Sequence, residues 1–462
     1  METGLIPAVR RLISDDDRVI SATMIEKKYL SDALGRVIGR AEALVFPVST
    51  AEVSALMTYA CRHSIPVTAR SAGTNLTGST VPLTGGLVLD FSRMNRLLEI
   101  DTETFTATVE PGILLADFQH AVEAHGLFYP PDPGEKASAI GGNIATNAGG
   151  MRAVKYGVTR DYVRGLEIVK ADGSVLNLGG KTVKDACGLS LKNLIIGSEG
   201  TLALITKGIL KLLPLPRESK GAVVAFSSLE AGITAVNPLL MSAPAAIEFL
   251  EQKVVALGEA YTGLSFPLSG WATYLVLMYH GESKNEIQER LQLAESIAND
   301  AGAKDFFVID EVESFNRIWQ IRGCLVKAVE AVSEQEPMDI VVPINRISDF
   351  IAIAHQLEAD SGLRMVSFGH AGNGNVHLCL MREGRSAEVW EQDLKTVMAA
   401  LYRAIIGMGG LVSGEHGIGI AKQPYYLENT APETIALMRQ IKAVFDPQNL
   451  LNPGKSYQKI LV

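Results

Sequence analysis

The sequence predicts an α+β protein built from two lobes. Two observations indicate this class: the glycine-rich first part alternates short strands with helices, and the middle part alternates helices with strands that are well separated along the chain. The 462 residues are enough for two or three domains without disulfide bonds. We expect domains at residues 1–220 and 221–409, followed by a glycine-rich segment at 410–462 that returns to the first domain and the functional site.

Capping and periodicity signals predict the elements of the first domain. Ser49 or Thr50 caps a helix that runs to about His63. Between Phe105 and Val109, apolar residues alternate with threonine, which is typical of a half-buried strand. Further strands and helices are expected over residues 67–69, 86–91, 114–125, 165–171 and 174–176, with a hairpin turn at 172–173.

The second domain is predicted from similar signals. Ser283 and Glu286 form a capping box in front of an amphipathic helix, and Ala387 to Met408 form a long helix. Strands are expected over residues 223–226, 274–278, 306–309, 339–342, 365–368 and 376–380.

Composition excludes several classes of function. The net charge is -9, with 42 basic and 51 acidic residues and no dense basic run, which argues against nucleic acid or anionic membrane as partner. The four cysteines are scattered along the chain, at Cys61, Cys187, Cys324 and Cys379. We therefore expect no structural zinc or iron–sulfur site within this chain, and we expect the protein to work in a reducing compartment. Residues 1–13 lack the pattern of a secretory signal, and no apolar run reaches about 18 residues. We therefore expect a cytoplasmic protein.

Two glycine-rich loops carry the first functional signal. They run from Arg70 to Gly78 and from Gly141 to Gly150. Glycines let the backbone approach a ligand closely, and successive N–H groups can then hold a pyrophosphate. Neither loop is a GxGxxG fingerprint or a GxxxxGK[ST] P-loop. One such loop alone could be an ordinary tight turn, but the two together predict a dinucleotide site.

These loops resemble known flavin segments. Residues 67–78 resemble the pyrophosphate loop of the vanillyl-alcohol-oxidase type of FAD enzymes, and residues 140–150 its second flavin-contacting loop. Residues 155–161, 197–201 and 449–455 resemble later segments of that fold, so the resemblance covers nearly the whole chain. Within the fold, the chain resembles the FAD-linked 2-hydroxyacid dehydrogenases, which include glycolate oxidase catalytic subunits, D-lactate dehydrogenases and D-2-hydroxyglutarate dehydrogenases. The resemblance implies a ferredoxin-like α+β cap domain.

The resemblance also implies which residues contact FAD. Ser71 and Thr146 depart from the family pattern, in which glycine and glutamate are frequent there, but both are small and polar. Neither loop contains a histidine, so we expect noncovalent FAD. The implied contacts are Arg70, Ser71, Ala72, Gly73, Thr74, Asn75, Gly78, Ser79, Asp132, Ser138, Gly141, Gly142, Asn143, Ala145, Thr146, Gly149, Gly150, Tyr156, Gly157, Glu199, Gly200, Ile205 and Asn452.

Two compact motifs contain three of the eight histidines. His370 and His377 flank a glycine-rich turn, and a hairpin there can bring both imidazoles to one point. Glu415 in the second motif would add a carboxylate, and two histidines with one carboxylate leave open positions on a divalent metal. Three ordinary histidines in turns are the plainer interpretation, but the family resemblance favours a metal site. Zinc, iron and manganese all suit this ligand set.

Four further residues are candidates for catalysis. A metal would lower the pKa of a bound substrate hydroxyl, and His416 could take its proton, the role the family assigns to this histidine. Arg322 matches the family's carboxylate-binding arginine, whose fork suits bidentate binding. Asn375 could hold a carboxylate or hydroxyl oxygen, and Lys422 is a weaker candidate. Val326 stands where D-2-hydroxyglutarate enzymes carry a further polar residue, which favours a short monocarboxylate such as lactate or glycolate.

Alternatives remain open from sequence. A noncatalytic flavin-carrying subunit should lack the histidine pair and the Glu415-His416 dipeptide, whereas a sugar-lactone or aromatic-alcohol oxidase on the same fold needs no metal. The electron acceptor could be a separate iron–sulfur subunit, an electron-transferring flavoprotein or a quinone. Residues 334–343 resemble members that work in complexes, so partner subunits are expected.

Overall fold

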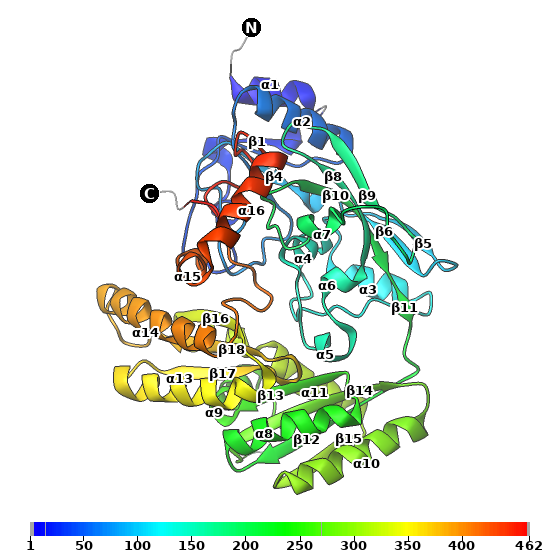
Figure 1. The fold of residues 1–462 in the computed structure, drawn as a ribbon, viewed down its shortest axis with the longest axis vertical. Helices are drawn as coiled ribbons and strands as arrows, with labels where there is room; N and C mark the ends of the chain where they lie inside the picture. Colours follow the sequence, from blue (N-terminus) through cyan, green and yellow to red (C-terminus); the bar gives the residue numbers. More distant parts are fainter. Residues whose placement is uncertain (1–3, 14, 269, 460–462) are drawn as a thin grey trace. The chain divides into compact units, whose positions relative to one another are not determined.

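The computed structural model describes residues 4–13, 15–268 and 270–459 (Figure 1). Its contacts divide the chain into two units. The first comprises Met1–Ala148, Val158–Leu215 and Glu415–Val462, and the second comprises Gly149–Gly157 and Pro216–Gly414. The segment Gly149–Gly157 thus belongs with the second unit, although the sequence places it in the first domain, because Met151 and Tyr156 pack against a hydrophobic cluster around Ala245. Residues 1–3, part of the segment expected to lack a signal, lie outside the described residues.

The first unit contains two main sheets. Its four-stranded sheet has the order β1-β2-β4-β3, with β2, β4 and β3 parallel, and is made of β1 (Val19–Ser21), β2 (Ala43–Val45), β4 (Leu87–Asp90) and β3 (Val67–Arg70). Its five-stranded antiparallel sheet is made, in order, of β5 (Leu97–Asp101), β6 (Thr106–Val109), β10 (Leu204–Lys211), β8 (Val163–Val169) and β9 (Val175–Gly179). β7 (Leu127–Phe128) pairs with β11 (Leu213–Pro214).

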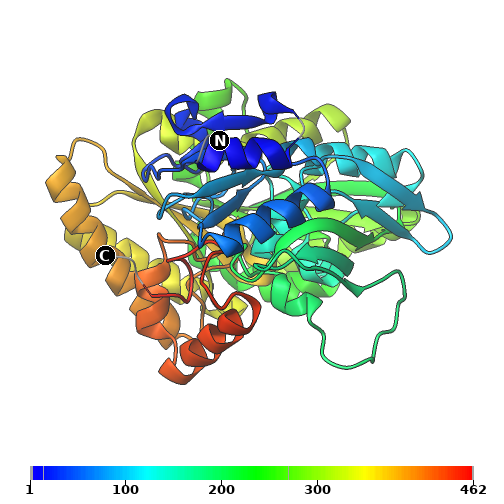
Figure 2. The same ribbon diagram turned by 90° about the horizontal axis from the view of Figure 1, so that it is seen from above.

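Helices complete the first unit. As the sequence predicts, Ser49 caps α2, its hydroxyl accepting from Glu52 N at 3.3 Å. Leu56 and Met57 of this helix join Val45 and Leu89 in a hydrophobic core beside the parallel strands. The helices are α1 (Leu5–Leu12), α2 (Thr50–Arg62), α3 (Leu115–Glu123), α4 (Ile140–Thr146), α6 (Thr159–Tyr162), α7 (Lys192–Ile195), α15 (Gln423–Asn429) and α16 (Pro432–Phe445). Figure 2 shows the segment between β9 and α7 as an extended loop, and its residues are mostly exposed.

The second unit is built on one antiparallel sheet of seven strands. In order, these are β15 (Asp305–Ile309), β12 (Glu218–Phe226), β14 (Thr273–Gly281), β13 (Ala246–Glu251), β17 (Met365–His370), β18 (Asn375–Met381) and β16 (Gln335–Val341). Its helices are α5 (Ala153–Tyr156), α8 (Leu229–Leu239), α9 (Gln252–Thr262), α10 (Lys284–Asp300), α11 (Val312–Gly323), α12 (Leu325–Val332), α13 (Ile347–Ser361) and α14 (Ala387–Gly407).

One face of this sheet supports the candidate site. Side chains alternate between the two faces of a strand, so residues two apart share a face. Leu250, Phe368 and Cys379 belong to the hydrophobic cluster that includes Ile321 of α11. Glu248, His370 and His377 are each two residues from one of these three, so they lie on the same face as α11.

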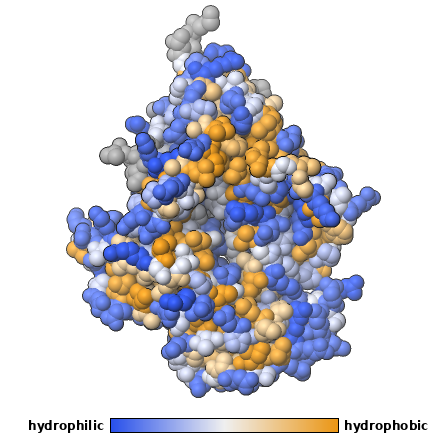
Figure 3. Space-filling view, in the orientation of Figure 1, coloured by the Kyte–Doolittle hydropathy of each residue, from blue (hydrophilic) through white to orange (hydrophobic). Residues whose placement is uncertain are grey.

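The surface mixes apolar and charged residues on the face that Figure 3 shows. Among the described helices the longest is α14, with 21 residues, and none combines the length and apolar character needed to cross a bilayer. All four cysteines lie in described parts of the chain and are free, as their spacing predicts.

Candidate active site

The loop after β3 is a cradle of backbone N–H groups. β3 ends at Arg70, whose guanidinium lies 3.4 Å from the Asp90 carboxylate and donates to Ser31 O at 3.0 Å. In the described part of the chain, the N–H groups of Ala72 to Asn75 donate to no protein acceptor. Gly73 has φ +71°, and a Cβ there would lie 1.9 Å from Arg70 Nη2. The loop therefore requires glycine at this point, and its donors fit phosphate oxygens.

The second glycine-rich segment is a loop only in its last part, because residues 141–146 are helical and belong to α4. Gly141 packs closely against Pro111, because a Cβ added at Gly141 would lie 2.5 Å from Pro111 Cβ. On the adjacent position, Gly142, a Cβ would meet nothing within 4 Å. The Thr146 hydroxyl donates to Gly142 O at 3.2 Å, so it stabilises the helix end. One side of α4 is thus closely packed and the other is open to a ligand.

Glu199 joins this region to the returning C-terminal chain. Its carboxylate accepts from the Ser79 hydroxyl at 2.5 Å and from the backbone N–H groups of Ile418 and Gly419 at 2.9 and 2.7 Å. Asn452 Nδ2 donates to Ser79 O at 2.9 Å and to Glu199 O at 2.7 Å. Ser79, Glu199 and Asn452 therefore hold three distant segments of the first unit together.

This network places the candidate base. His416 O accepts from the Thr77 hydroxyl at 3.4 Å. Gly417 has φ +82°, and a Cβ there would lie 3.0–3.3 Å from the Glu199 carboxylate. The chain can pass close to Glu199 here only because residue 417 is glycine. Lys422 is buried at the start of α15.

The other candidate flavin contacts fall in both units. Asp132 accepts from Lys136 Nζ at 2.7 Å, and Ser138, Asn143 and Ile205 are buried. Gly149, Gly150, Tyr156 and Gly157 belong to the second unit. There the Tyr156 hydroxyl lies 2.9 Å from His280 Nδ1, and burial together with Arg152 and Lys155 lowers the pKa of His280 to about 4.

In the second unit, four adjacent strands each contribute a buried polar side chain: Glu248 of β13, His370 of β17, His377 of β18 and Asp339 of β16. His377 and Asp339 are directly paired across β18 and β16. The hairpin between β17 and β18, which turns at Ala371–Asn373, brings the two histidines of the first motif together.

The two imidazoles converge through their Nε2 atoms, which lie 3.3 Å apart. Two nitrogen ligands bound at about 2.0–2.1 Å to a tetrahedral zinc lie about 3.3 Å from each other. The spacing of His370 and His377 therefore fits a shared divalent metal ion.

Glu248 binds both His370 and Arg322. One of its oxygens lies 2.7 Å from His370 Nδ1, and the other accepts from Arg322 Nε and Nη2 at 2.8 and 2.6 Å. Burial would raise the pKa of Glu248, but His370 and Arg322 outweigh it and hold that pKa below its ordinary value. Arg322 also lies over the Phe368 ring, with its guanidinium carbon 5.1 Å from the ring centre.

Asp339, on β16, lies at the other end of the row of four buried polar side chains and holds its neighbours by hydrogen bonds. Its Oδ1 accepts from Asn375 Nδ2 at 2.7 Å, and its Oδ2 accepts from Ser413 Oγ and Gly414 N at 2.9 and 3.0 Å. Asn375 Nδ2 also donates to Ile340 O at 2.8 Å, so both hydrogens of this amide are used within the sheet. Glu415 and His416 follow Gly414 directly in the chain.

The sequence candidates leave out several residues of these networks, among them Asp32, Glu248, Asp339 and Lys455. Asp32 accepts from Gly78 N at 2.8 Å, and buried Lys455 donates to Ser79 O at 2.9 Å and to Asn452 Oδ1. Lys455 and Asp339 lie in segments that the resemblance covers, which is a usable signal. Asp32 and Glu248 carry no motif.

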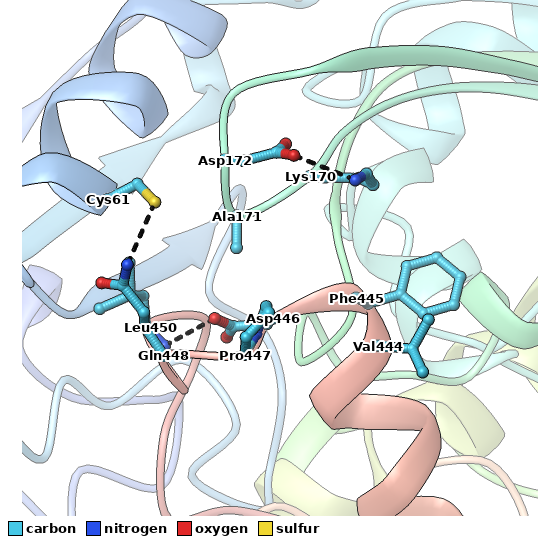
Figure 4. A pocket seen from close by; sticks show the side chains of 10 residues that line it. All are labelled: Cys61, Lys170, Ala171, Asp172, Val444, Phe445, Asp446, Pro447, Gln448 and Leu450. Atoms are coloured by element: carbon cyan, nitrogen blue, oxygen red, sulfur yellow. Dashed lines mark hydrogen bonds and ion pairs between the residues drawn. The ribbon is translucent and has the colours of Figure 1, made fainter.

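One cavity of the first unit is lined by residues outside these loops (Figure 4). It has a volume of about 150 Å³ and is lined by residues that include Cys61, Lys170, Asp172 and Gln448. Pockets for ligands of drug size are usually about 300–1,000 Å³. It is therefore too small for a dinucleotide.

Sequence comparison identifies the family. Residues 215–456 match the C-terminal domain of FAD linked oxidases, and residues 41–179 match an FAD binding domain. The chain belongs to the FAD-linked oxidases. It is 38% identical to a D-lactate dehydrogenase of Anaerostipes hadrus, over 96% of this chain and 95% of that one. It is 37% identical to glycolate oxidase subunit GlcD of Bacillus subtilis, over 93% of this chain and 92% of that one.

Solved structures agree on the fold. A substrate-bound p-cresol methylhydroxylase matches with a TM-score of 0.81 at 17% identity, covering 98% of this chain and 96% of that one. A 4-ethylphenol oxidase of Gulosibacter chungangensis matches with a TM-score of 0.77 at 19% identity, over 98% of this chain and 96% of that one. The prediction of a vanillyl-alcohol-oxidase type fold is confirmed, and this FAD-linked oxidase is an oxidoreductase.

Proposed function

We propose that this FAD-linked oxidase oxidises a short D-2-hydroxy acid, D-lactate or glycolate, to the 2-keto acid with the help of a divalent metal. The observation that carries the proposal is the 3.3 Å approach of His370 Nε2 to His377 Nε2 beside buried Arg322. An imidazole pair suited to a metal, together with an arginine suited to a carboxylate, matches the two polar groups of a 2-hydroxy acid. Relatives named D-lactate dehydrogenase and glycolate oxidase subunit support this substrate class.

The proposed metal ligands are His370, His377 and Glu415. The two imidazole nitrogens and the carboxylate oxygen of this set suit zinc, iron or manganese. A metal bound there would lower the pKa of a substrate hydroxyl. Asp339 is a further carboxylate of suitable type, because it pairs with His377 across the sheet.

The remaining roles fall to the chain's own residues. Arg322 uses its Nε and Nη2 for Glu248, and we assign the rest of its fork to the substrate carboxylate. His416 takes the proton of the substrate hydroxyl. The amide hydrogens of Asn375 are used by Asp339 and Ile340, so they are not available to a substrate oxygen, and we assign Asn375 to positioning Asp339 instead. Lys422 is a weaker candidate for binding the substrate carboxylate.

Specificity for a short acid is supported by Val326. This side chain packs against the hydrophobic cluster of the second unit. A second, distal carboxylate would meet an apolar group there and would lose its hydration without gaining a hydrogen bond. A monocarboxylate has no such cost.

The cofactor is proposed to be noncovalent FAD, held by the loop after β3, by α4 and by Glu199, Gly200 and Asn452. Bound there, FAD would supply the acceptor for the hydride that leaves the substrate carbon. The electrons then pass to a partner protein, either an electron-transferring flavoprotein or an iron–sulfur subunit, or to a quinone. A cytoplasmic location stays a prediction.

The test combines analysis and kinetics. Protein purified from its native source is assayed for flavin, for divalent metals and for co-purifying electron acceptors, and then mixed rapidly with D-lactate, L-lactate, glycolate and D-2-hydroxyglutarate. We expect one FAD, a stoichiometric metal and fast flavin reduction by D-lactate or glycolate. A metal-free protein that reduces its flavin at full rate would support a sugar or alcohol oxidase instead. Absence of reduction by all four acids would support a noncatalytic subunit.

A further inference from the structure

We infer that Glu248 is a positioning residue that fixes both the tautomer of His370 and the orientation of Arg322, and so couples the metal site to the carboxylate site. This inference rests on the proposed function, because it assigns a purpose to the contacts between the two sites. Glu248 is fully buried in β13, a central strand of the second unit.

The contacts divide the carboxylate between two partners. Its Oε1 lies 2.7 Å from His370 Nδ1, whereas its Oε2 faces Arg322 Nε and Nη2 at 2.8 and 2.6 Å. An ionised carboxylate can only accept, so Nδ1 carries the hydrogen of this bond. Arg322 Nη2 also lies 3.4 Å from Nδ1, but its 2.6 Å contact with Oε2 is much shorter, so Glu248 decides the tautomer. In the neutral ring the lone pair then lies on Nε2, the atom that approaches His377. Carboxylate–histidine–metal arrangements of this kind orient the ring and raise its basicity.

The same carboxylate limits how Arg322 can move. Two donors on one edge of the guanidinium bind Oε2, so the plane of the group is fixed relative to β13. Phe368 packs against that plane and restricts it further. The outer donors of Arg322 are thereby aimed in one direction, which favours recognition of a carboxylate at a set distance from the imidazoles.

Glu248→Gln reverses this arrangement with almost no change in shape. Arg322 has only donors, so the amide oxygen of the glutamine must face it. The amide NH2 then faces His370 Nδ1, which must become the acceptor, and the ring hydrogen moves to Nε2. A protonated Nε2 cannot bind a metal. We therefore expect the variant to bind Zn²⁺ about 10- to 100-fold more weakly than the parent protein.

Glu251→Gln is the matched control. Glu251 lies three residues further along the same strand and is also buried, but it contacts Ser367, Lys253 and His355 and not the histidine pair. Its substitution likewise removes a buried charge from β13. It should leave Zn²⁺ affinity and the kinetics with D-lactate within about twofold of the parent.

The experiment titrates Zn²⁺ into metal-stripped, FAD-loaded protein in competition with a chelator, for the parent, Glu248→Gln and Glu251→Gln. The histidine tautomers are read by ¹⁵N chemical shifts, and flavin absorbance and the unfolding temperature report folding. Where Glu248→Gln is too unstable to purify, Glu248→Asp replaces it, because it keeps the charge but is too short to reach both partners. We expect weakened Zn²⁺ binding, a changed tautomer at one histidine and a raised KM for D-lactate.

The outcomes separate the two claims. If the parent binds Zn²⁺ and Glu248→Gln binds it equally well with an unchanged tautomer, the inference is overturned while the proposed function stands. Equal weakening in Glu251→Gln would also overturn it, since the effect would then be general to buried charge in β13. If the parent binds neither Zn²⁺ nor another divalent ion, the proposed function fails and takes the inference with it.

Discussion

Asp339 and His377 are directly opposed on neighbouring antiparallel strands, and the same aspartate also accepts a hydrogen bond from Gly414 N. Cross-strand partners lie on one face of a sheet, so the carboxylate and the imidazole share a face. Gly414 is followed at once by Glu415 and His416. One buried side chain thus connects the strand of a candidate metal ligand with the segment that carries a third candidate ligand and the candidate base.

Loss of His377 should remove metal and turnover together. His377→Ala deletes one of two convergent imidazoles, so we expect at least about 10-fold less bound metal and little flavin reduction, while FAD content stays normal. Metal analysis, flavin absorbance and rapid mixing check this. His355→Ala is the control, because His355 is 43% exposed and lies outside the pair. Wild-type turnover in a metal-free His377→Ala protein would contradict the metal proposal.

Arg322 and His416 should affect different kinetic constants. Arg322 is proposed to hold the substrate carboxylate in the ground state and in the transition state alike. Arg322→Ala should therefore raise KM for D-lactate about 10- to 150-fold, because a charge-assisted hydrogen bond contributes about 1.5–3 kcal/mol. It also leaves Glu248 buried without its cation, so the unfolding temperature should fall.

His416→Ala should instead slow flavin reduction about 100- to 10,000-fold with a modest change in binding, because a general base acts in the transition state. Rapid-mixing kinetics over a range of D-lactate concentrations separate the two effects. Near-normal reduction by the His416 variant would remove it as the base. Faster reduction by L-lactate would refute the D-hydroxyacid assignment.

The sequence predicts the parts of this molecule whose signals are local. The helix that Ser49 caps and the β17–β18 hairpin that joins His370 to His377 both depend on residues close together in the chain. β13 has no such signal. Its residues Glu248 and Glu251 are of a type that is depleted in strands and rarely buried, so a central strand there is not expected from composition.

Tertiary contacts account for the remaining differences. The segment Gly149–Gly157 groups with the second unit through packing that its own sequence does not reveal. Both amide hydrogens of Asn375 are used by β16, which is 35 or so residues away in the chain and cannot be inferred from the motif around the residue. Buried polar groups take the partners that the fold supplies, so their roles are the least predictable from sequence.

FAD retention should depend on Gly73 for a steric reason. Gly73→Ala places a methyl group against Arg70, whose guanidinium is held by Asp90 and Ser31 and cannot retreat freely. Gly126→Ala is the control: Gly126 has nearly the same φ, +70° against +71°, but nothing lies within 4 Å of its Cβ position. Both variants bear the cost of about 1–2 kcal/mol for a left-handed residue, so only Gly73→Ala should lose flavin.

Flavin content per chain after purification measures that difference, and acid precipitation tests the linkage. All the yellow colour should enter the supernatant, because neither glycine-rich loop has a histidine to bind flavin covalently. Colour that stays with the pellet would contradict a noncovalent cofactor. Equal flavin loss in both variants would attribute the effect to backbone strain rather than to contact with Arg70.

Lys455 should make stability depend on pH above neutrality. Its ammonium group is buried between Ser79 O and Asn452, and burial, partly offset by Glu199 and Asp32, lowers its pKa from 10.5 to about 7. Between these two values the unfolded chain binds more protons than the folded one, so stability rises with pH across the window. The stability gained in this way is complete above pH 10.5, the pKa of the lysine in the unfolded chain. It is lost as the pH falls through about 7, its pKa in the folded protein.

The measurement is the free energy of unfolding from pH 6.5 to 10 for the parent protein, Lys455→Met and Lys459→Met. The parent should gain stability relative to Lys455→Met as pH rises, with a slope of up to about 1.4 kcal/mol per pH unit, the value for one proton. Lys459→Met should follow the parent, because Lys459 is exposed. Parallel curves for the parent and Lys455→Met would mean that Lys455 keeps its charge in the folded protein, stabilised by Glu199 and Asp32 more strongly than its burial opposes.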